Sequence, residues 1–460
     1  MMCETFPLTA AEKLHLLAVQ EFNPQVVNIG VCLTMKANLD FGLLKKCIQL
    51  EYQRCDSLRI RFTPPDDSGE IRQYIAPFDS RDIRFVDFTG KSQEEIQKTM
   101  YDWTAVPFAR YDSPMNEFVM VSLPDGYQGM YLLFDHMLTD SCGVIAMVKD
   151  IMELYSHYVF GTPYPQPLLS YRDAAEADLK KAADPIRHAK DEAFWKEQAA
   201  LGEPIFTSIA GPRLLEESRR RHHNPSLRAA DRQMTDLSVG QSSYFLEPEP
   251  SQRLMDYCAM YGISMTNLFL MGLRTYLSKV NGRQPDISVR NYVSRRTSRL
   301  SRLSGGTRIH CYPCRTIIPE DTEFLDGVRT IQILQNNIYK HVNYDSTAAV
   351  QAYLKAYNAP PKTTYESVAL TYQPVPIRMP NEKLAQIPYK SKWFTNGTAI
   401  QELYLTVMDC PSGGLEFYFK YQTAQVSDHD VELLYYYLMR IIFMGVENPE
   451  MTVGEIMDAV

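Results

Sequence analysis

The sequence predicts an α/β protein, of the α+β kind, organised as two large lobes. Helical and strand-like hydrophobic patterns alternate through the first half, and a similar mixture returns after a polar segment at about residues 176–240. With 460 residues, of which 45% are hydrophobic and 22% charged, the chain is long enough for two cores or for a pseudo-symmetric pair of lobes. The composition excludes disordered and fibrous classes.

The first hundred residues are expected to alternate between helices and strands. Thr9 and Glu12 have the spacing of a capping box, which predicts that a helix begins there. Ser92 and Glu95 form a second capping box ahead of residues 96–103. Between the two boxes, hydrophobic periodicity predicts a strand over 26–35, a helix over 40–55 and a strand over 57–62.

A hairpin and then a buried helix are expected next. Two β-rich runs within 117–134 flank Pro-Asp-Gly, where glycine supplies the positive φ that such turns need. Beyond them, apolar residues recur at helical spacing, at Val144, Val148, Ile151 and Tyr155. Residues 135–143 therefore join a strand to a helix, and such junctions commonly carry functional side chains.

The second half is predicted to resume after the polar segment, which is the expected connection between the lobes. A helix over 250–262 precedes a helix over 264–280 that Asn281 and Gly282 end, and a strand follows over 286–293. Near the C-terminus, two strands over 400–409 and 415–422 flank Pro-Ser-Gly-Gly, which suits a hairpin. A final helix closes the pattern.

Charge and cysteine usage restrict the partners and the compartment. The formal net charge of −8 and the lack of a basic stripe argue against a nucleic-acid partner. The most apolar helix is interrupted by Arg440 and is too short for a membrane span. Nine cysteines without framework spacing favour a reducing compartment, and the N-terminus has no secretory leader, so we expect a cytoplasmic protein.

The stretch "YLLFDHMLTDSCG", residues 131–143, carries the candidate chemistry. A histidine is well suited to take a proton near neutral pH, and His136 lies between Asp135 and Asp140. Asp140, four residues downstream, is the better candidate for bracing the turn through an arginine or backbone N–H groups. Spacing alone is weak support, because a lone histidine is more often a structural residue.

Several motifs together resemble the condensation domains of nonribosomal peptide synthetases, within the chloramphenicol-acetyltransferase-like acyltransferase superfamily. "DHMLTDS" is similar to the motif His-His-x-x-x-Asp-Gly of that family. Four supporting segments follow the family order along nearly the whole chain: "RCDSLRIRF" (54–62), "SYRDAA" (170–175), "FWKEQAALGEP" (194–204) and "GTRIHCYPCR" (306–315).

The resemblance implies a V-shaped pseudo-dimer of two chloramphenicol-acetyltransferase-like lobes with an active-site tunnel between them. The N-terminal lobe, carrying the "DHMLTDS" motif, is expected at 1–180 and the C-terminal lobe at 181–460. An acyl thioester donor would react with an amine or alcohol acceptor to form an amide or an ester, in natural-product biosynthesis. Because no further segment follows the last predicted helix, we expect a free-standing condensation enzyme.

The resemblance also assigns roles to individual residues. His136 aligns with the catalytic histidine, which accepts a proton from the acceptor nucleophile or positions that nucleophile. Asp140 aligns with the aspartate that pairs with an arginine from the other lobe; Arg295 and Arg296 are available, and Arg296 fits the spacing better. Backbone N–H groups of the turn or nearby hydroxyls, such as that of Ser141, would meet the developing oxyanion. Arg315 is the motif arginine of the last supporting segment.

The motif departs from the family pattern at two positions. Asp135 replaces the first histidine, and Ser141 replaces a glycine, although Gly143 two residues later can restore flexibility. Asp135 and Asp140 also have the spacing found in heterocyclisation domains, which usually carry a serine where this chain has Gly143. A third hypothesis is a noncatalytic condensation-like domain that recruits a carrier protein or a tailoring enzyme.

Two further patterns are interpreted as structural. "RRRHH", residues 219–223, is expected to be solvated surface rather than a phosphate site. "HCYPC", residues 310–314, has no second ligand pair for zinc, and we expect it to pack in a strand. No metal and no tightly bound cofactor are expected, since the acyl group would arrive on the 4'-phosphopantetheine of a carrier protein or on coenzyme A.

Overall fold

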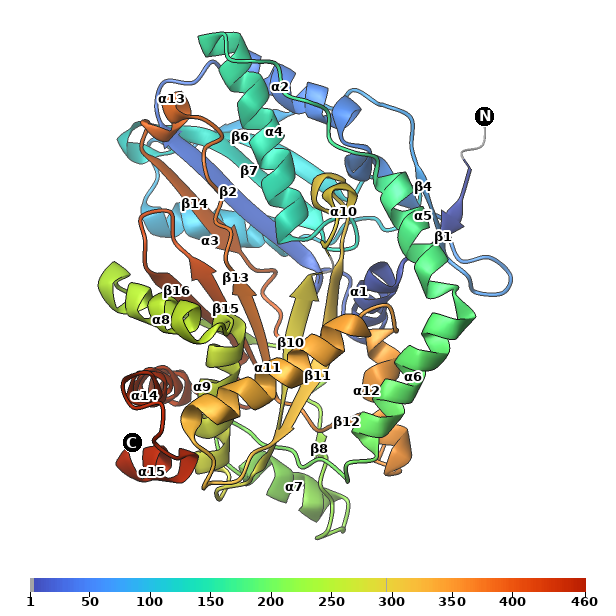
Figure 1. Cartoon of the computed structure of the whole chain (residues 1–460). Helices are drawn as coiled ribbons and strands as arrows, with labels where there is room; N and C mark the ends of the chain where they lie inside the picture. Colours follow the sequence, from blue (N-terminus) through green and yellow to red (C-terminus); the bar gives the residue numbers. More distant parts are fainter. Residues whose placement is uncertain (1–3, 295) are drawn as a thin grey trace. The chain divides into compact units, whose positions relative to one another are not determined.

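The structure is a computed structural model that describes residues 4–294 and 296–460, and the chain divides into two compact units (Figure 1). Unit 1 contains the described residues of 4–183, 294–309 and 377–398, and unit 2 contains 184–293, 310–376 and 399–460. The predicted single boundary near residue 180 is thus close to the first transition. A single boundary there puts residues 294–309 and 377–398 in the C-terminal lobe, whereas both segments belong to unit 1. The sequence did not reveal this, because the partners of these segments lie far away in the chain.

Unit 1 is built on a five-stranded sheet with strand order β14-β2-β7-β6-β5, in which only β5 and β6 are parallel. Its strands are β14 (Tyr389–Phe394), β2 (Asn28–Lys36), β7 (Tyr127–Asp135), β6 (Asn116–Ser122) and β5 (Arg84–Asp87). A small sheet combines β1 (Phe6–Pro7), β4 (Arg72–Ile75) and β3 (Ile60–Phe62). The central position of β7 in the larger sheet fixes the point at which the Asp-His-Asp turn begins.

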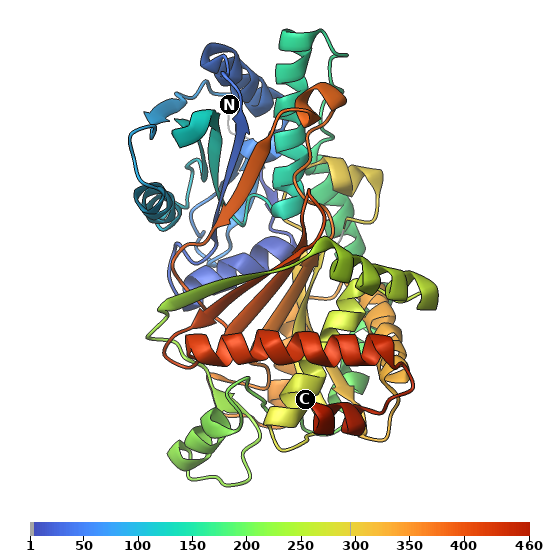
Figure 2. The ribbon, with the colours of Figure 1, turned by 90° about the vertical axis from the view of Figure 1, so that its left-hand side faces the viewer.

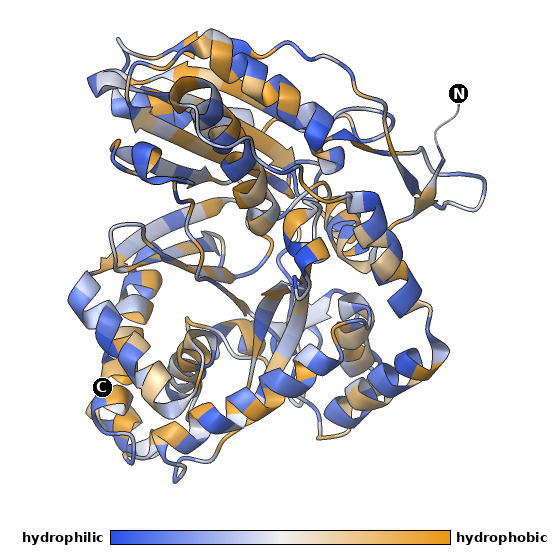
Figure 3. Ribbon diagram, turned by 45° about the horizontal axis from the view of Figure 1, so that its top comes forward, coloured by the Kyte–Doolittle hydropathy of each residue, from blue (hydrophilic) through white to orange (hydrophobic). Residues whose placement is uncertain are grey.

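Helices pack on both faces of the larger sheet. Buried side chains of α2 (Phe41–Arg54) and α4 (Ser141–Phe160) form one core with alternate residues of β2, β6 and β7. Side chains of α3 (Gln93–Thr104) form a second core on the opposite face. In Figure 3 these strands are mostly orange and the helices change between orange and blue, as expected for elements that bury one stripe.

The remaining helices of unit 1 are short or peripheral. They are α1 (Ala10–Glu21), α5 (Tyr171–Ala182), α10 (Arg299–Leu303) and α13 (Glu382–Ala385), with 3₁₀ turns at Asp56–Arg59 and Pro124–Gly126. The second 3₁₀ turn connects β6 to β7, which pair antiparallel from Ser122↔Gln128 onward. This confirms the predicted hairpin. The capping boxes at Thr9 and Ser92 are also confirmed.

Unit 2 is built on a six-stranded sheet with order β11-β10-β13-β15-β16-β9. Its strands are β11 (Ile309–Ile317), β10 (Asp286–Ser294), β13 (Val368–Gln373), β15 (Leu403–Asp409), β16 (Leu415–Gln422) and β9 (Val239–Leu246). β15 and β16 pair antiparallel from Asp409↔Leu415, which confirms the predicted second hairpin. A short pair joins β8 (Ala230–Asp231) to β12 (Thr363–Thr364).

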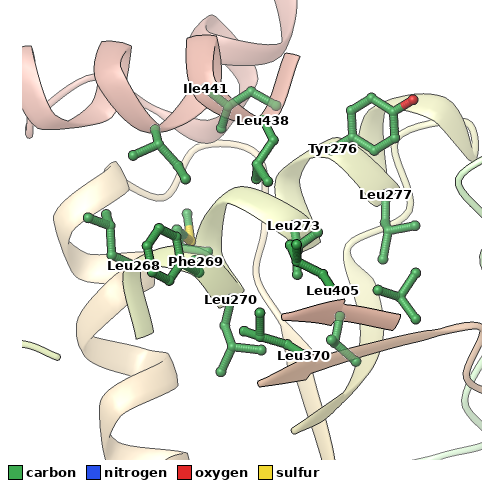
Figure 4. Packing of buried hydrophobic residues seen from close by; sticks show 14 of the residues in the cluster. Leu268, Phe269, Leu270, Leu273, Tyr276, Leu277, Leu370, Leu405, Leu438 and Ile441 are labelled. Atoms are coloured by element: carbon green, nitrogen blue, oxygen red, sulfur yellow. The ribbon is translucent and has the colours of Figure 1, made fainter. Parts of the chain in front are cut away.

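One face of this sheet is covered by helices. Leu268, Phe269 and Leu273 pack with strand residues and with Leu438 and Ile441 in a large buried cluster (Figure 4). In Figure 2 the long helix α14 (Asp428–Glu447), in red, runs across the strands. The helices of unit 2 are α6 (Pro185–Ala199), α7 (Arg213–Arg221), α8 (Pro248–Tyr261), α9 (Met265–Val280), α11 (Phe324–Lys340), α12 (Ser346–Ala356), α14 (Asp428–Glu447) and α15 (Val453–Ala459).

The polar segment 176–240, expected as a connection, instead contains α6, α7 and β8 in unit 2. Its buried residues pack into the unit 2 cores: Trp195 of α6, for example, is 1% exposed and stacks on Tyr312 of β11. The many charged residues on the exposed faces of α6 and α7 therefore made these amphipathic helices look like a polar connection in the sequence. Among the described helices, none has the length and apolarity needed to cross a bilayer.

Candidate active site

The turn 135–140 leaves the central strand of the unit 1 sheet and enters α4. Backbone N–H groups of Asp135 and His136 donate to the carbonyls of Met115 and Val27, at 3.0 and 2.8 Å. The N–H of Leu138 donates to the Asp135 carbonyl at 2.9 Å. The turn is therefore hydrogen-bonded to the protein at its first residues and rigidly supported.

Asp140 is the N-cap of α4 and is fully buried. Its Oδ1 accepts from the N–H of Gly143 at 2.9 Å and from Nη2 and Nε of Arg296 at 2.7 and 3.2 Å. Its Oδ2 accepts from the N–H of Arg308 at 2.9 Å. The expected pair of Asp140 with Arg296 is present, although Arg296 belongs to unit 1 rather than to the other compact unit. Arg295 lies outside the described residues.

The segment 305–308, Gly-Thr-Arg preceded by a further glycine, organises the far side of the turn. Arg296 donates to the carbonyls of Gly305 and Gly306, and Gly306 also forms a β-bridge with Thr139. Gly306 has a φ of +72°, and a Cβ there would lie 2.2 Å from the ring of Tyr171. A side chain at this position is thus excluded by both backbone conformation and space.

Asp135 has a structural environment. It is fully buried, its Oδ2 lies 2.8 Å from Nη2 of Arg110, and its Oδ1 accepts from the N–H of Met137 at 2.9 Å. Burial raises the pKa of Asp135, and the charge of Arg110 opposes that shift. The carboxylate is therefore occupied in bracing the start of the turn, whereas Asp140 braces its end.

His136 is the partly exposed member of the turn. Burial of its ring lowers its pKa below the ordinary value of 6.5, against the opposing negative charge of Asp140. The nitrogen Nδ1 is buried, and no group among the described residues hydrogen-bonds to it in good geometry. The neutral imidazole is consequently the favoured form at neutral pH, which is the form a general base needs.

The start of α4 explains why Ser141 can replace the glycine of the motif and why Gly143 follows it. Ser141 is the first residue of α4 and has no positive φ, so the backbone gives no reason to require glycine there. At position 143, by contrast, glycine is required for space, because a Cβ there would lie 2.2 Å from Oγ1 of Thr139 and 3.2 Å from Nη2 of Arg296. The role of Gly143 is close approach rather than the flexibility that the sequence suggested.

Sequence reasoning missed His15 and Glu12 as members of this site. The His15 ring stacks on His136 with centroids 4.3 Å apart. Glu12, one turn earlier on α1, is fully buried and accepts from the hydroxyl of Tyr171 and the amide of Gln73, both at 2.6 Å. The available signal was the capping box, which puts Glu12 and His15 on the same buried face of α1.

Arg315 is not brought to this turn. It lies on β11 in unit 2 and forms a bidentate pair with Asp286 at 2.8 and 2.6 Å. It also donates to the carbonyl of Gly202. Its recorded partners all belong to unit 2, so its observed role is to hold β11, β10 and the end of the α6 region together.

The other motifs have structural surroundings. Asp56, in the first supporting segment, accepts from the hydroxyl of Ser170 and the N–H of Tyr171, so the first two segments contact each other. In the "RRRHH" run, Arg221 and His222 both pair with Asp231. In "HCYPC", both cysteines are buried on β11, and burial raises the pKa of their thiols, so they stay neutral and pack as apolar residues.

Comparisons with known proteins agree over nearly the whole chain. In sequence, the chain is 21% identical to a plipastatin synthase protein and 23% identical to surfactin synthase subunit 1, both of Bacillus subtilis (strain 168), over 98% of its own length in each case. It spans only 17% and 12% of those two relatives.

Solved structures give the same fold. The first condensation domain of the calcium-dependent antibiotic synthetase, in complex with a substrate analogue, is similar with a TM-score of 0.78 at 18% identity, covering 98% of each chain. A variant of the starter condensation domain of rhizomide synthetase, in complex with C8-CoA, has a TM-score of 0.79 at 18% identity, covering 98% of this chain and 96% of that one. The family model of the condensation domain matches residues 3–458, and the chain therefore belongs to the condensation-domain family.

Proposed function

We propose that this protein is an acyltransferase of the condensation type, which joins an acyl thioester to an amine or alcohol acceptor to form an amide or an ester. The observation that carries the proposal is the partly exposed His136, favoured as the neutral imidazole, on a turn braced from two sides by Asp135 with Arg110 and by Asp140 with Arg296. A rigidly placed base that is neutral at the working pH is what acyl transfer without a covalent intermediate requires.

His136 acts on the acceptor nucleophile. As the amine or alcohol attacks the thioester carbonyl, His136 accepts its proton through Nε2, because Nδ1 is buried. The tetrahedral oxyanion then collapses, the C–S bond breaks, and the departing thiolate takes the proton back from the imidazolium. A well-placed general base contributes about 10² to 10⁴ in rate.

The first turn of α4 stabilises the oxyanion. The first N–H groups of a helix have no partner within that helix, and its N-terminus carries a partial positive charge. Since Asp140 already accepts from Gly143, the N–H groups of Ser141 and Cys142 and the Ser141 hydroxyl are the donors assigned to this role. Such preorganised donors commonly contribute about 3 kcal/mol each.

The donor is a phosphopantetheine thioester, borne by a carrier protein or by coenzyme A. Support comes from two rhizomide synthetase structures, one in complex with C8-CoA and one in complex with both C8-CoA and Leu-SNAC. Nonribosomal peptide synthesis is the corresponding setting, given the relatives in plipastatin and surfactin synthases.

The two alternatives make different use of the same turn. Heterocyclisation would use Asp135 in the chemistry, whereas its carboxylate is buried against Arg110 and the N–H of Met137. A recruiting domain would need no base at all. The intact brace on both sides of His136 favours acyl transfer over both alternatives.

The test is product analysis by mass spectrometry. Purified protein is incubated with a panel of acyl-pantetheine, acyl-CoA and acyl-carrier thioesters crossed with amines and alcohols, beside His136→Ala and His136→Gln. The exposed His429 supplies the control variant His429→Ala. A product that disappears in both His136 variants and persists in the control supports the proposal. If a product still forms in both His136 variants, His136 is not the base. If no pair of substrates gives a product, the proposed acyl transfer is refuted.

The pH profile gives an independent check. Because burial lowers the pKa of His136, its neutral form persists below pH 6.5, and the acid limb of kcat/KM is expected below that value. An acid limb above pH 6.5 would contradict this assignment of the base.

A further inference from the structure

The two imidazole rings of His15 and His136 stack with centroids 4.3 Å apart and planes 25° apart. His15 comes from the buried face of α1 and is 8% exposed. The two residues are far apart in sequence, and none of the five motif segments quoted above includes His15. The stack places one flat ring directly against the His136 imidazole.

The edge of the His15 ring is anchored to the segment that braces the turn. Nε2 of His15 lies 3.2 Å from Oγ1 of Thr307. The residue before Thr307 forms the bridge to Thr139, and the residue after it donates its N–H to Asp140. One short segment therefore fixes both the Asp140 brace and the ring that faces His136.

The hydrogen bonds at the Nδ1 atom of His136 fall short of standard geometry. In most catalytic histidines, a hydrogen bond at the second ring nitrogen sets the tautomer and the ring direction. Here the backbone of His136 and Thr139 lies near the ring and favours its charged form, but Nδ1 is buried without a hydrogen bond in good geometry among the described residues. The χ2 torsion of histidine has a broad profile, so ring packing adds to the orientation that the backbone provides.

We propose that His15 is a positioning residue for acyl transfer: its stacked ring fixes the plane of His136 and keeps water from that face of the imidazole. The inference rests on the proposed function, and it concerns the geometry of the base rather than its identity. The charged groups that face His136 are Asp135 and Asp140 of its own turn, and α1 contributes His15.

The test compares two substitutions of one residue with a matched control. His15→Phe keeps a flat ring in the stack, and His15→Ala removes it. The control is His341→Ala in unit 2, where His341 stacks on Phe194 at 4.4 Å and 12°. We expect His15→Ala to lower kcat/KM by about 10- to 100-fold, since small misplacements of a catalytic group cost that much. His15→Phe should stay within about threefold of the unsubstituted protein, and the control should keep its activity.

The pH profile separates positioning from simple loss of stability. In His15→Ala, water reaches the exposed ring face, so the acid limb of kcat/KM should move up toward pH 6.5, the ordinary pKa of histidine. In His15→Phe and His341→Ala it should stay in place. Equal losses in His15→Phe and His15→Ala, with unchanged melting temperatures, would overturn the proposal.

A readout without activity keeps the two proposals distinguishable. Protein labelled with ¹³C at histidine Cε1 is titrated by NMR, and the His136 signal is assigned from its loss in His136→Gln. Its midpoint should rise in His15→Ala and stay unchanged in His15→Phe and His341→Ala. An unchanged midpoint in His15→Ala overturns the role of His15, whatever the activity. A shifted midpoint in a protein that transfers no acyl group overturns the proposed function but leaves the orienting contact in place.

Discussion

Arg296 holds Oδ1 of Asp140 with two donors, at 2.7 and 3.2 Å, across 156 positions of sequence. Both side chains are buried, at 5% and 0% exposure. Arg296 also donates to the carbonyls of Ser301, Gly305 and Gly306, so one guanidinium ties the segment 296–306 to the start of α4. The turn that carries His136 is shaped by this long-range pair.

Arg296→Ala should destabilise the protein strongly. Removing one partner of a buried ion pair leaves the other charge unpaired and typically costs about 3–5 kcal/mol. The measurement is the free energy of unfolding in denaturant, together with transfer activity below the transition. Arg329→Ala is the control, because its pair with Asp326 is exposed on both sides and worth at most about 1 kcal/mol. Equal stability of the two variants would show that the buried pair does not brace the turn.

Gly143→Ala should damage the same turn through space rather than charge. Its Cβ would lie 2.2 Å from Oγ1 of Thr139, which is too close for any Cβ contact. We expect a loss of about 1–3 kcal/mol, as for overpacked sites, and lower transfer activity. Adding Thr139→Ala removes the clashing hydroxyl and should recover part of the loss. Gly90→Ala, which meets open space, is the control; no recovery in the double variant would count against the steric account.

Glu12→Gln should change how stability depends on pH. Burial raises the pKa of Glu12 from 4.5 to about 7, with hydrogen bonds from Tyr171 and Thr9 opposing. The folded state holds this proton more tightly than the unfolded chain does. The stabilisation that protonated Glu12 gives to the folded state is therefore complete below pH 4.5 and is lost as the pH rises to about 7. The unfolding free energy, measured by denaturation across this window, should therefore fall less in the glutamine variant, by on the order of 3 kcal/mol.

Glu455 offers the matched control for that titration. It also belongs to a capping box, but it is exposed, and the backbone N–H of Thr452 lowers its pKa. The stabilisation that ionised Glu455 gives to the folded state depends on pH in the opposite direction. It is lost only as the pH falls below 4.5, the ordinary pKa of a glutamate. Glu455→Gln should leave the pH window above 4.5 unchanged, and a parallel flattening in both variants would mean that the effect does not come from the burial of Glu12.

Asp135→Asn should reduce stability and spare the chemistry. The substitution leaves Arg110 without its buried partner, which we expect to cost about 3–5 kcal/mol. Below the unfolding transition, transfer activity should remain within about tenfold of the unsubstituted protein, because Asp135 braces the turn and His136 is the base. Loss of activity in a protein of unchanged stability would support the heterocyclisation hypothesis instead.

Local patterns determined much of the fold. Both hairpins formed where Pro-Asp-Gly and Pro-Ser-Gly-Gly were expected, because turns are decided by a few residues with special φ preferences. The capping boxes at Thr9 and Ser92 began helices as predicted, since they satisfy backbone groups within one turn of chain. The segment 176–240 was misjudged because long charged side chains cover helices that bury only a narrow stripe.

The sequence by itself determined the family resemblance, the strand-to-helix turn and His136 as the candidate base, since these depend on residues close together in the chain. Only the tertiary structure decided that β14 joins the sheet of unit 1, that Arg110 neutralises Asp135 and that His15 stacks on His136. These contacts join residues distant in sequence, and their free energy comes from burial and pairing in a packed interior, which leave no periodic or local signal to read.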